Sequence, residues 1–102
     1  MWVDVVAEVD FPLGAKKLYA TDFEDILILH LETGFYAIEN RCSHDHIQMD
    51  EGCVEDGAWV CPFHGAHFCL RSGKALTPPA YEDIEVYAVR TASGMVQIDV
   101  DA

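Results

Sequence analysis

Two short segments of the sequence each contain one cysteine and one histidine at ligand spacing. Cys42 and His44 are separated by one residue, Cys61 and His64 by two, and sixteen residues lie between the segments. Thiolates and imidazoles bind zinc and iron in preference to magnesium or calcium. Because each pair fits within a tight loop, two loops that meet at one centre could supply all four ligands. The pattern therefore indicates a metal centre.

Two kinds of metal site compete for these four residues. A Cys2His2 zinc site needs four ligands around one ion, but the usual zinc spacings pair Cys with Cys and His with His. Here each segment supplies one of each. That arrangement suits a two-iron cluster in which both cysteines bind one iron and both histidines bind the other. A zinc-stabilised binding module without redox activity is the alternative.

The other cysteines and histidines have simpler interpretations. His46 and His67 flank the ligand pairs but fit the spacing less well, so we expect solvated loop residues, with a ligand role as the alternative. His30 lies within an apolar run, which is typical of a structural histidine. Cys53 and Cys69 are expected to be free, partly buried thiols, with a disulfide or a metal site as the alternative.

The flanks of the chain have the pattern of β-strands, which must position these loops. Residues 2–9 alternate loosely between apolar and acidic side chains. Residues 26–31 and 35–40 are apolar runs around a Glu-Thr-Gly connection, which predicts a hairpin. A second hairpin is predicted from residues 84–91 and 95–100, which are joined by Ala-Ser-Gly.

The middle of the chain differs from both flanks. Residues 40–80 contain all four cysteines and four of the five histidines, and only residues 57–62 predict a clear, short strand. We therefore predict one domain over residues 1–102. Its base comprises residues 1–39 and 81–102, and the loop-rich insert between them carries the metal site.

Composition excludes several classes of partner. The chain has 102 residues, with 18 acidic and 6 basic side chains, and a net charge of −12. Nucleic-acid binding needs a basic face, and anionic membrane surfaces are disfavoured for the same reason. The apolar runs are too short for a membrane span, and the N-terminus lacks the basic region of a signal peptide. We expect a cytoplasmic monomer.

The ligand spacing resembles that of the Rieske-type [2Fe–2S] proteins. CPFHGAHF, followed by LRSGKAL, is similar to the second cluster-binding loop of soluble Rieske ferredoxins, and Thr77-Pro78-Pro79 stands where that family has a loop covering the cluster. The resemblance implies an all-β fold, in which an antiparallel β-sandwich base carries an inserted cluster-binding subdomain. It also implies one cluster, with Cys42 and Cys61 on the inner iron and His44 and His64 on the outer iron.

The chain lacks two features of the respiratory branch of the family. Respiratory Rieske subunits have a disulfide between the ligand loops, where this chain has Ile47 and Phe63. They also have hydroxyl donors to sulfur, where this chain has Ala66 and Phe68. The missing donors predict a reduction potential near the low end of the Rieske range, at about −150 mV.

The resemblance thus implies an electron carrier and not an enzyme. Oxygenase subunits need a further domain with a mononuclear iron, for which this chain has no room. The best match is the ferredoxin component of an aromatic ring-hydroxylating dioxygenase system, which takes electrons from a flavin-dependent reductase and passes them to the terminal oxygenase. The small subunit of nitrite reductase is the alternative within the family.

Overall fold

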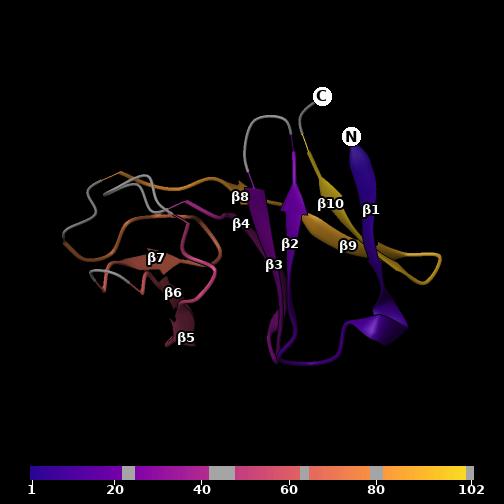
Figure 1. Cartoon of the computed structure of the whole chain (residues 1–102), viewed down its shortest axis with the longest axis horizontal. Helices are drawn as coiled ribbons and strands as arrows, with labels where there is room; N and C mark the ends of the chain where they lie inside the picture. The colour runs from indigo at the N-terminus through magenta and orange to yellow at the C-terminus, as the bar shows by residue number, and fades with distance from the viewer. Residues whose placement is uncertain (22–24, 42–47, 63–64, 79–81, 101–102) are drawn as a thin grey trace.

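The computed structural model of the chain consists of strands in three antiparallel sheets (Figure 1). It describes residues 1–21, 25–41, 48–62, 65–78 and 82–100. The elements, in chain order, are β1 (Trp2–Ala7), the 3-10 turn η1 (Glu8–Asp10), β2 (Lys16–Ala20), β3 (Asp25–Leu31), β4 (Gly34–Glu39), β5 (Cys53–Glu55), β6 (Ala58–Val60), β7 (His67–Cys69), β8 (Val86–Tyr87), β9 (Val89–Ala92) and β10 (Met95–Asp99).

The sheet β2-β3-β4-β8 forms the middle layer (Figure 1). Its central strand β3 pairs with β2 on one side and β4 on the other. Successive side chains point to opposite faces, so Ile26 and Ile28 pack in one core while Leu27 and Leu29 pack in another. Burial on both faces explains why this strand has a continuous apolar run in place of an alternating pattern.

The two remaining sheets lie on opposite sides of this layer (Figure 1). The sheet β1-β10-β9 covers one side, and Val96 and Ile98 of β10 join the core of Ile26 and Ile28. The small sheet β5-β6-β7 lies on the other side, and its Trp59 joins the core of Leu27 and Leu29. The base is therefore a sandwich of two sheets, as the resemblance implied, and the third sheet is formed within residues 40–80.

The first predicted hairpin is confirmed as β3–β4, and the second is confirmed around its turn, as β9–β10. The second turn has positive φ at both central residues, 52° at Ser93 and 79° at Gly94, which matches the right-handed twist of the flanking strands. The expected strand over 2–9 is shorter, because η1 begins at Glu8.

One predicted strand is wrong in its pairing. Residues 84–91 do not form a single strand of the second hairpin: β8 pairs with β4 in the middle sheet, whereas β9 pairs with β10 in the outer sheet. The chain crosses between the two sheets at Ala88, which lies between β8 and β9. Alternation in a sequence reports which face a side chain takes and carries no information on the neighbouring strand.

Three short strands were not predicted, namely β2, β5 and β7. β2 lies at the edge of its sheet, and four of its five side chains are exposed, so its sequence has no buried stripe. Among the described residues, no helix has the length and apolar character needed to cross a bilayer.

Candidate metal centre

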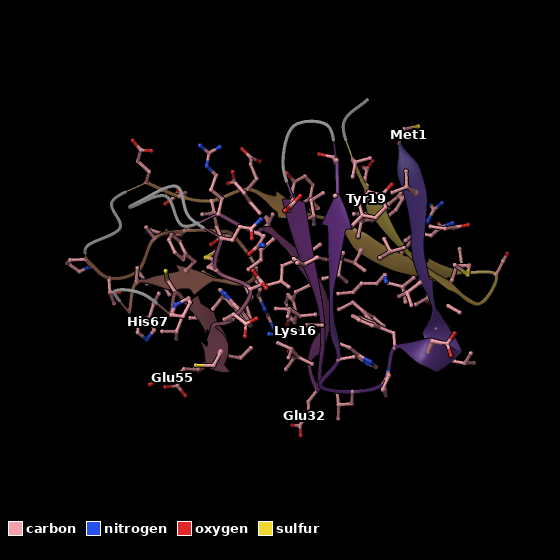
Figure 2. All side chains as sticks on the ribbon, in the orientation of Figure 1. Met1, Lys16, Tyr19, Glu32, Glu55 and His67 are labelled. Carbon is pink, nitrogen blue, oxygen red and sulfur yellow. The ribbon has the colours of Figure 1, made fainter. Side chains whose placement is uncertain are left out.

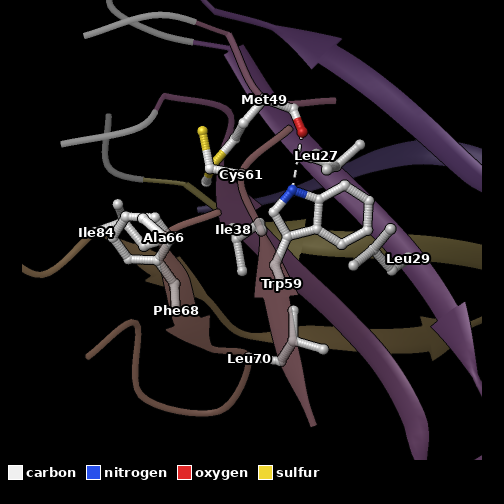
Figure 3. Close-up of a cluster of buried hydrophobic side chains, with 10 residues drawn as sticks. All are labelled: Leu27, Leu29, Ile38, Met49, Trp59, Cys61, Ala66, Phe68, Leu70 and Ile84. Atoms are coloured by element: carbon white, nitrogen blue, oxygen red, sulfur yellow. Dashed lines mark hydrogen bonds between the residues drawn. The ribbon is translucent and has the colours of Figure 1, made fainter. Parts of the chain in front are cut away.

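Of the four predicted ligands, Cys61 is placed by the structure, whereas Cys42, His44 and His64 lie outside the described residues. Cys61 directly follows β6 and its side chain is 1% exposed. It lies at the edge of an apolar cluster, beside Met49 (Figure 3). The members of this cluster are Leu27, Leu29, Ile38, Met49, Trp59, Cys61, Ala66, Phe68, Leu70 and Ile84.

The loop after Cys61 is the closed end of the β6–β7 hairpin. The strands pair as far as Val60 with His67, and the next pair is joined by a hydrogen bond of 2.8 Å from the Cys61 N–H to the Ala66 carbonyl. Inside this pair the Gly65 N–H donates to the Cys61 carbonyl over 3.1 Å, with Gly65 at φ +71°. Five residues, 62–66, thus separate the predicted ligand Cys61 from the start of β7.

The segment that contains Cys42 and His44 is closed at its base by a buried side chain. Asn40 follows β4 and is 3% exposed. Its side-chain oxygen accepts the Met49 N–H over 2.9 Å, and its amide nitrogen donates to the Asp50 carboxylate over 3.2 Å. The two ends of the first predicted ligand loop are therefore held together across residues 41–48.

A third segment is tied to β7 beside the second loop. The His67 N–H donates to the Thr77 hydroxyl over 3.0 Å, and the Leu76 N–H donates to the His67 carbonyl over 2.8 Å. This segment leads into the prolines that the resemblance assigned to a loop covering the cluster. Pro78 is exposed, and Pro79 lies outside the described residues.

The two non-ligand histidines that the structure describes are engaged with protein groups. The His67 Nδ1 lies 2.8 Å from the Gly65 carbonyl, and its Nε2 lies 3.9 Å from Glu55 (Figure 2). The His30 Nδ1 lies 2.8 Å from the Phe11 carbonyl, and its ring stacks on Phe35 at 4.2 Å. His30 is a structural residue, as predicted. His46 lies outside the described residues.

Cys53 and Cys69 are both free, as predicted, but the expected partial burial is confirmed for Cys69 and wrong for Cys53. Cys53 is exposed on β5, while Cys69 is partly buried at the end of β7. The Ser72 hydroxyl lowers the pKa of the Cys69 thiol below its ordinary value of 9.0 by donating to it. The backbone N–H groups of Ser72 and Arg71 and the Arg71 charge act in the same direction, and burial opposes them weakly.

The surroundings of Cys61 fit a cluster-bound thiolate. A thiolate on the inner side of an iron–sulfur cluster needs a dry environment, and Cys61 packs among Met49, Ala66 and Phe68, which are each 0% exposed. Two cysteines and two histidines are also the donor set of a Rieske cluster. Within the described ranges, no three His, Cys, Asp or Glu side chains are grouped closely enough to hold another ion.

Sequence reasoning missed the supporting residues of the site. Asn40 comes just before the first ligand pair, but a single polar residue after a strand carries no signal that it will be buried. Trp59 is a second such residue: its Nε1 donates to the Met49 carbonyl over 2.8 Å (Figure 3). These hydrogen bonds join segments far apart in the sequence, which spacing alone does not reveal.

Comparisons with known proteins agree with the predicted cofactor. A family model described as "Rieske [2Fe-2S] domain" matches residues 1–88. A protein named 3-phenylpropionate/cinnamic acid dioxygenase ferredoxin subunit, from Photorhabdus laumondii, is 43% identical over 88 residues, which are 85% of this chain and 82% of that protein.

Solved structures show the same fold. A chain from a complex of reduced oxygenase and oxidised ferredoxin in carbazole 1,9a-dioxygenase has a TM-score of 0.85 and 26% identity, over 95% of this chain and 91% of that one. A putative NADH-dependent nitrite reductase small subunit from Mycobacterium tuberculosis also has a TM-score of 0.85, at 21% identity over 100% of this chain and 96% of that one. At 21% identity, the similarity to the nitrite reductase subunit shows a shared fold alone.

Proposed function

The chain belongs to the Rieske [2Fe–2S] domain family, and we propose that it carries single electrons from a flavin-dependent reductase to the terminal oxygenase of an aromatic ring-hydroxylating dioxygenase. The observation that carries the proposal is the 43% identity to a dioxygenase ferredoxin subunit over most of both chains. The nitrite reductase alternative has a likeness of fold in its favour, at 21% identity.

We assign Cys42 and Cys61 to the inner iron of the cluster, and His44 and His64 to the outer iron. The cluster supplies reversible uptake of one electron. Cys61 would hold it on the protein side, where Met49 and the neighbouring apolar side chains exclude water. Two backbone hydrogen bonds, from the Cys61 N–H to the Ala66 carbonyl and from the Gly65 N–H to the Cys61 carbonyl, fix the backbone on both sides of this predicted ligand segment.

Metal analysis of the purified protein tests the cofactor and its ligands. We expect two irons and two sulfides per chain and a Rieske-type EPR spectrum on reduction. Cys61→Ala should lose the cluster, whereas Cys53→Ser, at an exposed cysteine, should keep it. His64→Cys should keep iron with an altered spectrum, and an unchanged spectrum would remove His64 from the ligand set. A colourless protein with one zinc per chain would refute the proposal.

Reconstitution of the electron-transfer chain tests the partners. The oxygenase of a 3-phenylpropionate/cinnamic acid dioxygenase is the first to try, because its ferredoxin subunits are related to this chain. With a flavin-dependent reductase and NADH, the wild-type protein should support product formation, and Cys61→Ala should not. Transfer to a nitrite reductase catalytic subunit in place of the oxygenase would favour the alternative.

A further inference from the structure

One hydrogen bond, donated by an indole N–H, connects the two predicted ligand loops directly, without a metal between them. We propose that Trp59 is a positioning residue that sets the separation of these loops. Gly52 is required because a side chain there would displace the indole ring. The inference rests on the proposed function, since it concerns residues that position the segments carrying the predicted cluster ligands. It assigns to Trp59 a role in electron transfer beyond filling the core.

The position of Trp59 makes it suitable as a link. It lies in β6, two residues before Cys61, and is 2% exposed. Its Nε1 donates to the Met49 carbonyl over 2.8 Å (Figure 3). Met49 is the residue on which the first ligand loop ends, because its N–H closes that loop onto Asn40. The Trp59 hydrogen bond therefore ties the end of the first loop to the start of the second.

Gly52 provides an independent observation of the same arrangement. A Cβ at Gly52 would lie 2.1 Å from the Val60 carbonyl oxygen and 3.0 Å from the Trp59 Nε1. The Gly52 N–H also donates to the Met49 carbonyl, over 3.1 Å. The backbone from Met49 to Gly52 thus wraps around the nitrogen edge of the indole, and only glycine leaves enough room there.

The first loop has a second tie, to the base of the molecule. The Lys16 Nζ donates to the Asp50 carbonyl over 2.5 Å, and the Asp50 carboxylate accepts the Asn40 amide. These contacts hold the loop end against the middle sheet, while Trp59 holds it against β6. Loss of the indole N–H would leave the contacts of Lys16 and Asn40 with Asp50 in place. It would release the first ligand loop only from the second. The expected effect is a changed ligand geometry with the fold retained.

Two replacements of Trp59 test the link. Trp59→Phe removes the N–H and part of the ring, whereas Trp59→β-(3-benzothienyl)alanine keeps the shape of the side chain and removes the N–H alone. Trp2→Phe is the matched control, because Trp2 lies on β1 in the outer sheet and stacks under Arg90. The isostere is incorporated in the Trp2→Phe background so that Trp59 alone is replaced.

Three properties are measured. The first is the rate of cluster loss to a chelator, monitored by visible absorbance, and the others are the EPR spectrum of the reduced protein and its reduction potential. We expect both Trp59 replacements to speed cluster loss about five- to tenfold, the value of one buried hydrogen bond, and to shift the EPR g-values. Trp2→Phe should change neither. In the metal-free protein, the Trp59 indole proton should exchange with solvent much more slowly than that of Trp2.

A double-mutant cycle tests whether Gly52 and Trp59 act together. Gly52→Ala should speed cluster loss in both backgrounds, because the added methyl group meets the Val60 carbonyl oxygen in each, but the increase should be smaller in Trp59→Phe, where the second clash, with the indole nitrogen, is absent. Additive effects would contradict a shared role. If the wild type holds a [2Fe–2S] cluster and both Trp59 replacements match Trp2→Phe in loss rate and spectrum, the positioning role is wrong. If the wild type holds no cluster, it is the proposed function that fails.

Discussion

Ala66 stands where the respiratory Rieske subunits have a hydroxyl donor to sulfur. Its carbonyl accepts the Cys61 N–H and its side chain is fully buried in the same apolar cluster. A methyl group there donates nothing to sulfur, and Phe68 likewise has no donor. Fewer donors stabilise the added electron less. We therefore predict a potential of about −150 mV, and a clearly positive value in protein-film voltammetry would contradict it.

Ala66→Ser is expected to raise that potential. The new hydroxyl would sit beside Cys61 and could donate to cluster or ligand sulfur, which favours the reduced form. A shift of about +60 mV corresponds to a tenfold change in the one-electron equilibrium. Ala75→Ser is the control, because Ala75 packs on the same cluster of side chains from its margin. Equal shifts in the two variants would show that added polarity, and not a donor at this position, changes the potential.

The Cys69 thiol should react at lower pH than an ordinary cysteine. Donors from Ser72 and Arg71 lower its pKa in the folded protein, so the thiolate fraction rises below the ordinary value of 9.0. In cluster-loaded Cys53→Ser protein, the alkylation rate at Cys69 should therefore have its pH midpoint below 9.0. Ser72→Ala should move the midpoint upward, and an unmoved midpoint would remove the hydroxyl as the cause.

The same lowered pKa makes stability depend on pH. The folded state binds the Cys69 proton less tightly than the unfolded chain, so the free energy of unfolding rises with pH between the folded value and 9.0. The contribution is complete above the unfolded value and is lost as pH falls through the folded value. Urea unfolding of the wild type and Cys69→Ser at several pH values should show this rise in the wild type alone.

At the scale of residues, chemistry was predictable where it depends on type and spacing. The Cys and His pairs identified the cofactor class, and the apolar neighbours of His30 identified a structural histidine. The roles of Asn40 and Gly52 were not predictable, because each depends on a contact with a residue elsewhere in the fold. The ligand assignments of Cys42, His44 and His64 stay predictions.

At the scale of elements, the turn after β7 is held to the segment that leads into β8. The Ile84 N–H donates to the Gly73 carbonyl over 2.8 Å, and a Cβ at Gly73 would lie 2.0 Å from the Ile84 carbonyl oxygen. Gly73→Ala combines this clash with a φ of +76° that side chains rarely adopt. We expect it to reduce the free energy of unfolding by about 3 kcal/mol.

Gly57→Ala is the matched control for this prediction. Gly57 has a similar φ of +78°, but a Cβ there would meet nothing within 4 Å. It should lose only the backbone preference, about 1 kcal/mol. Urea denaturation of the two variants separates the clash from the strain, and equal midpoints would show that the close approach at Ile84 relaxes freely.

Elements were predictable in proportion to the regularity of their burial. The β3–β4 hairpin has a dense apolar run and a glycine at its turn, and it was found from these features. β2 is an exposed edge strand, and β5 and β7 have three residues each, so none presents a repeating pattern. The exchange of sheets at Ala88 depends on hydrogen-bond partners, which local patterning does not encode.

At the scale of the whole molecule, the charge of −12 predicts association that depends on salt. A strongly acidic carrier is attracted to basic faces on its partners, and dissolved ions screen that attraction. Electron transfer to the oxygenase, followed by stopped flow, should slow about tenfold between 50 and 500 mM salt. Transfer rates that do not change with salt concentration would show that the charge contributes to solubility and not to association.

The position of the charge can be tested separately from its amount. Glu51 and Glu55 are exposed beside the third sheet, whereas Glu8 and Asp10 are exposed on η1 next to β1. The double variant Glu51→Gln/Glu55→Gln and the double variant Glu8→Gln/Asp10→Asn remove the same charge. We expect the first to slow low-salt transfer and the second to leave it within about twofold. Equal slowing would assign the effect to net charge.

The pairing of β1 with β10 has a consequence for how the protein is made. Among the described residues, β1 pairs with β10 alone, Trp2 with Asp99 and Ala7 with Met95. On a ribosome, residues 2–7 must therefore remain unpaired until residues 95–99 have emerged. The segment with the cluster ligands leaves the exit tunnel before that closure. Iron loading can thus begin on a nascent chain whose base sandwich is still open.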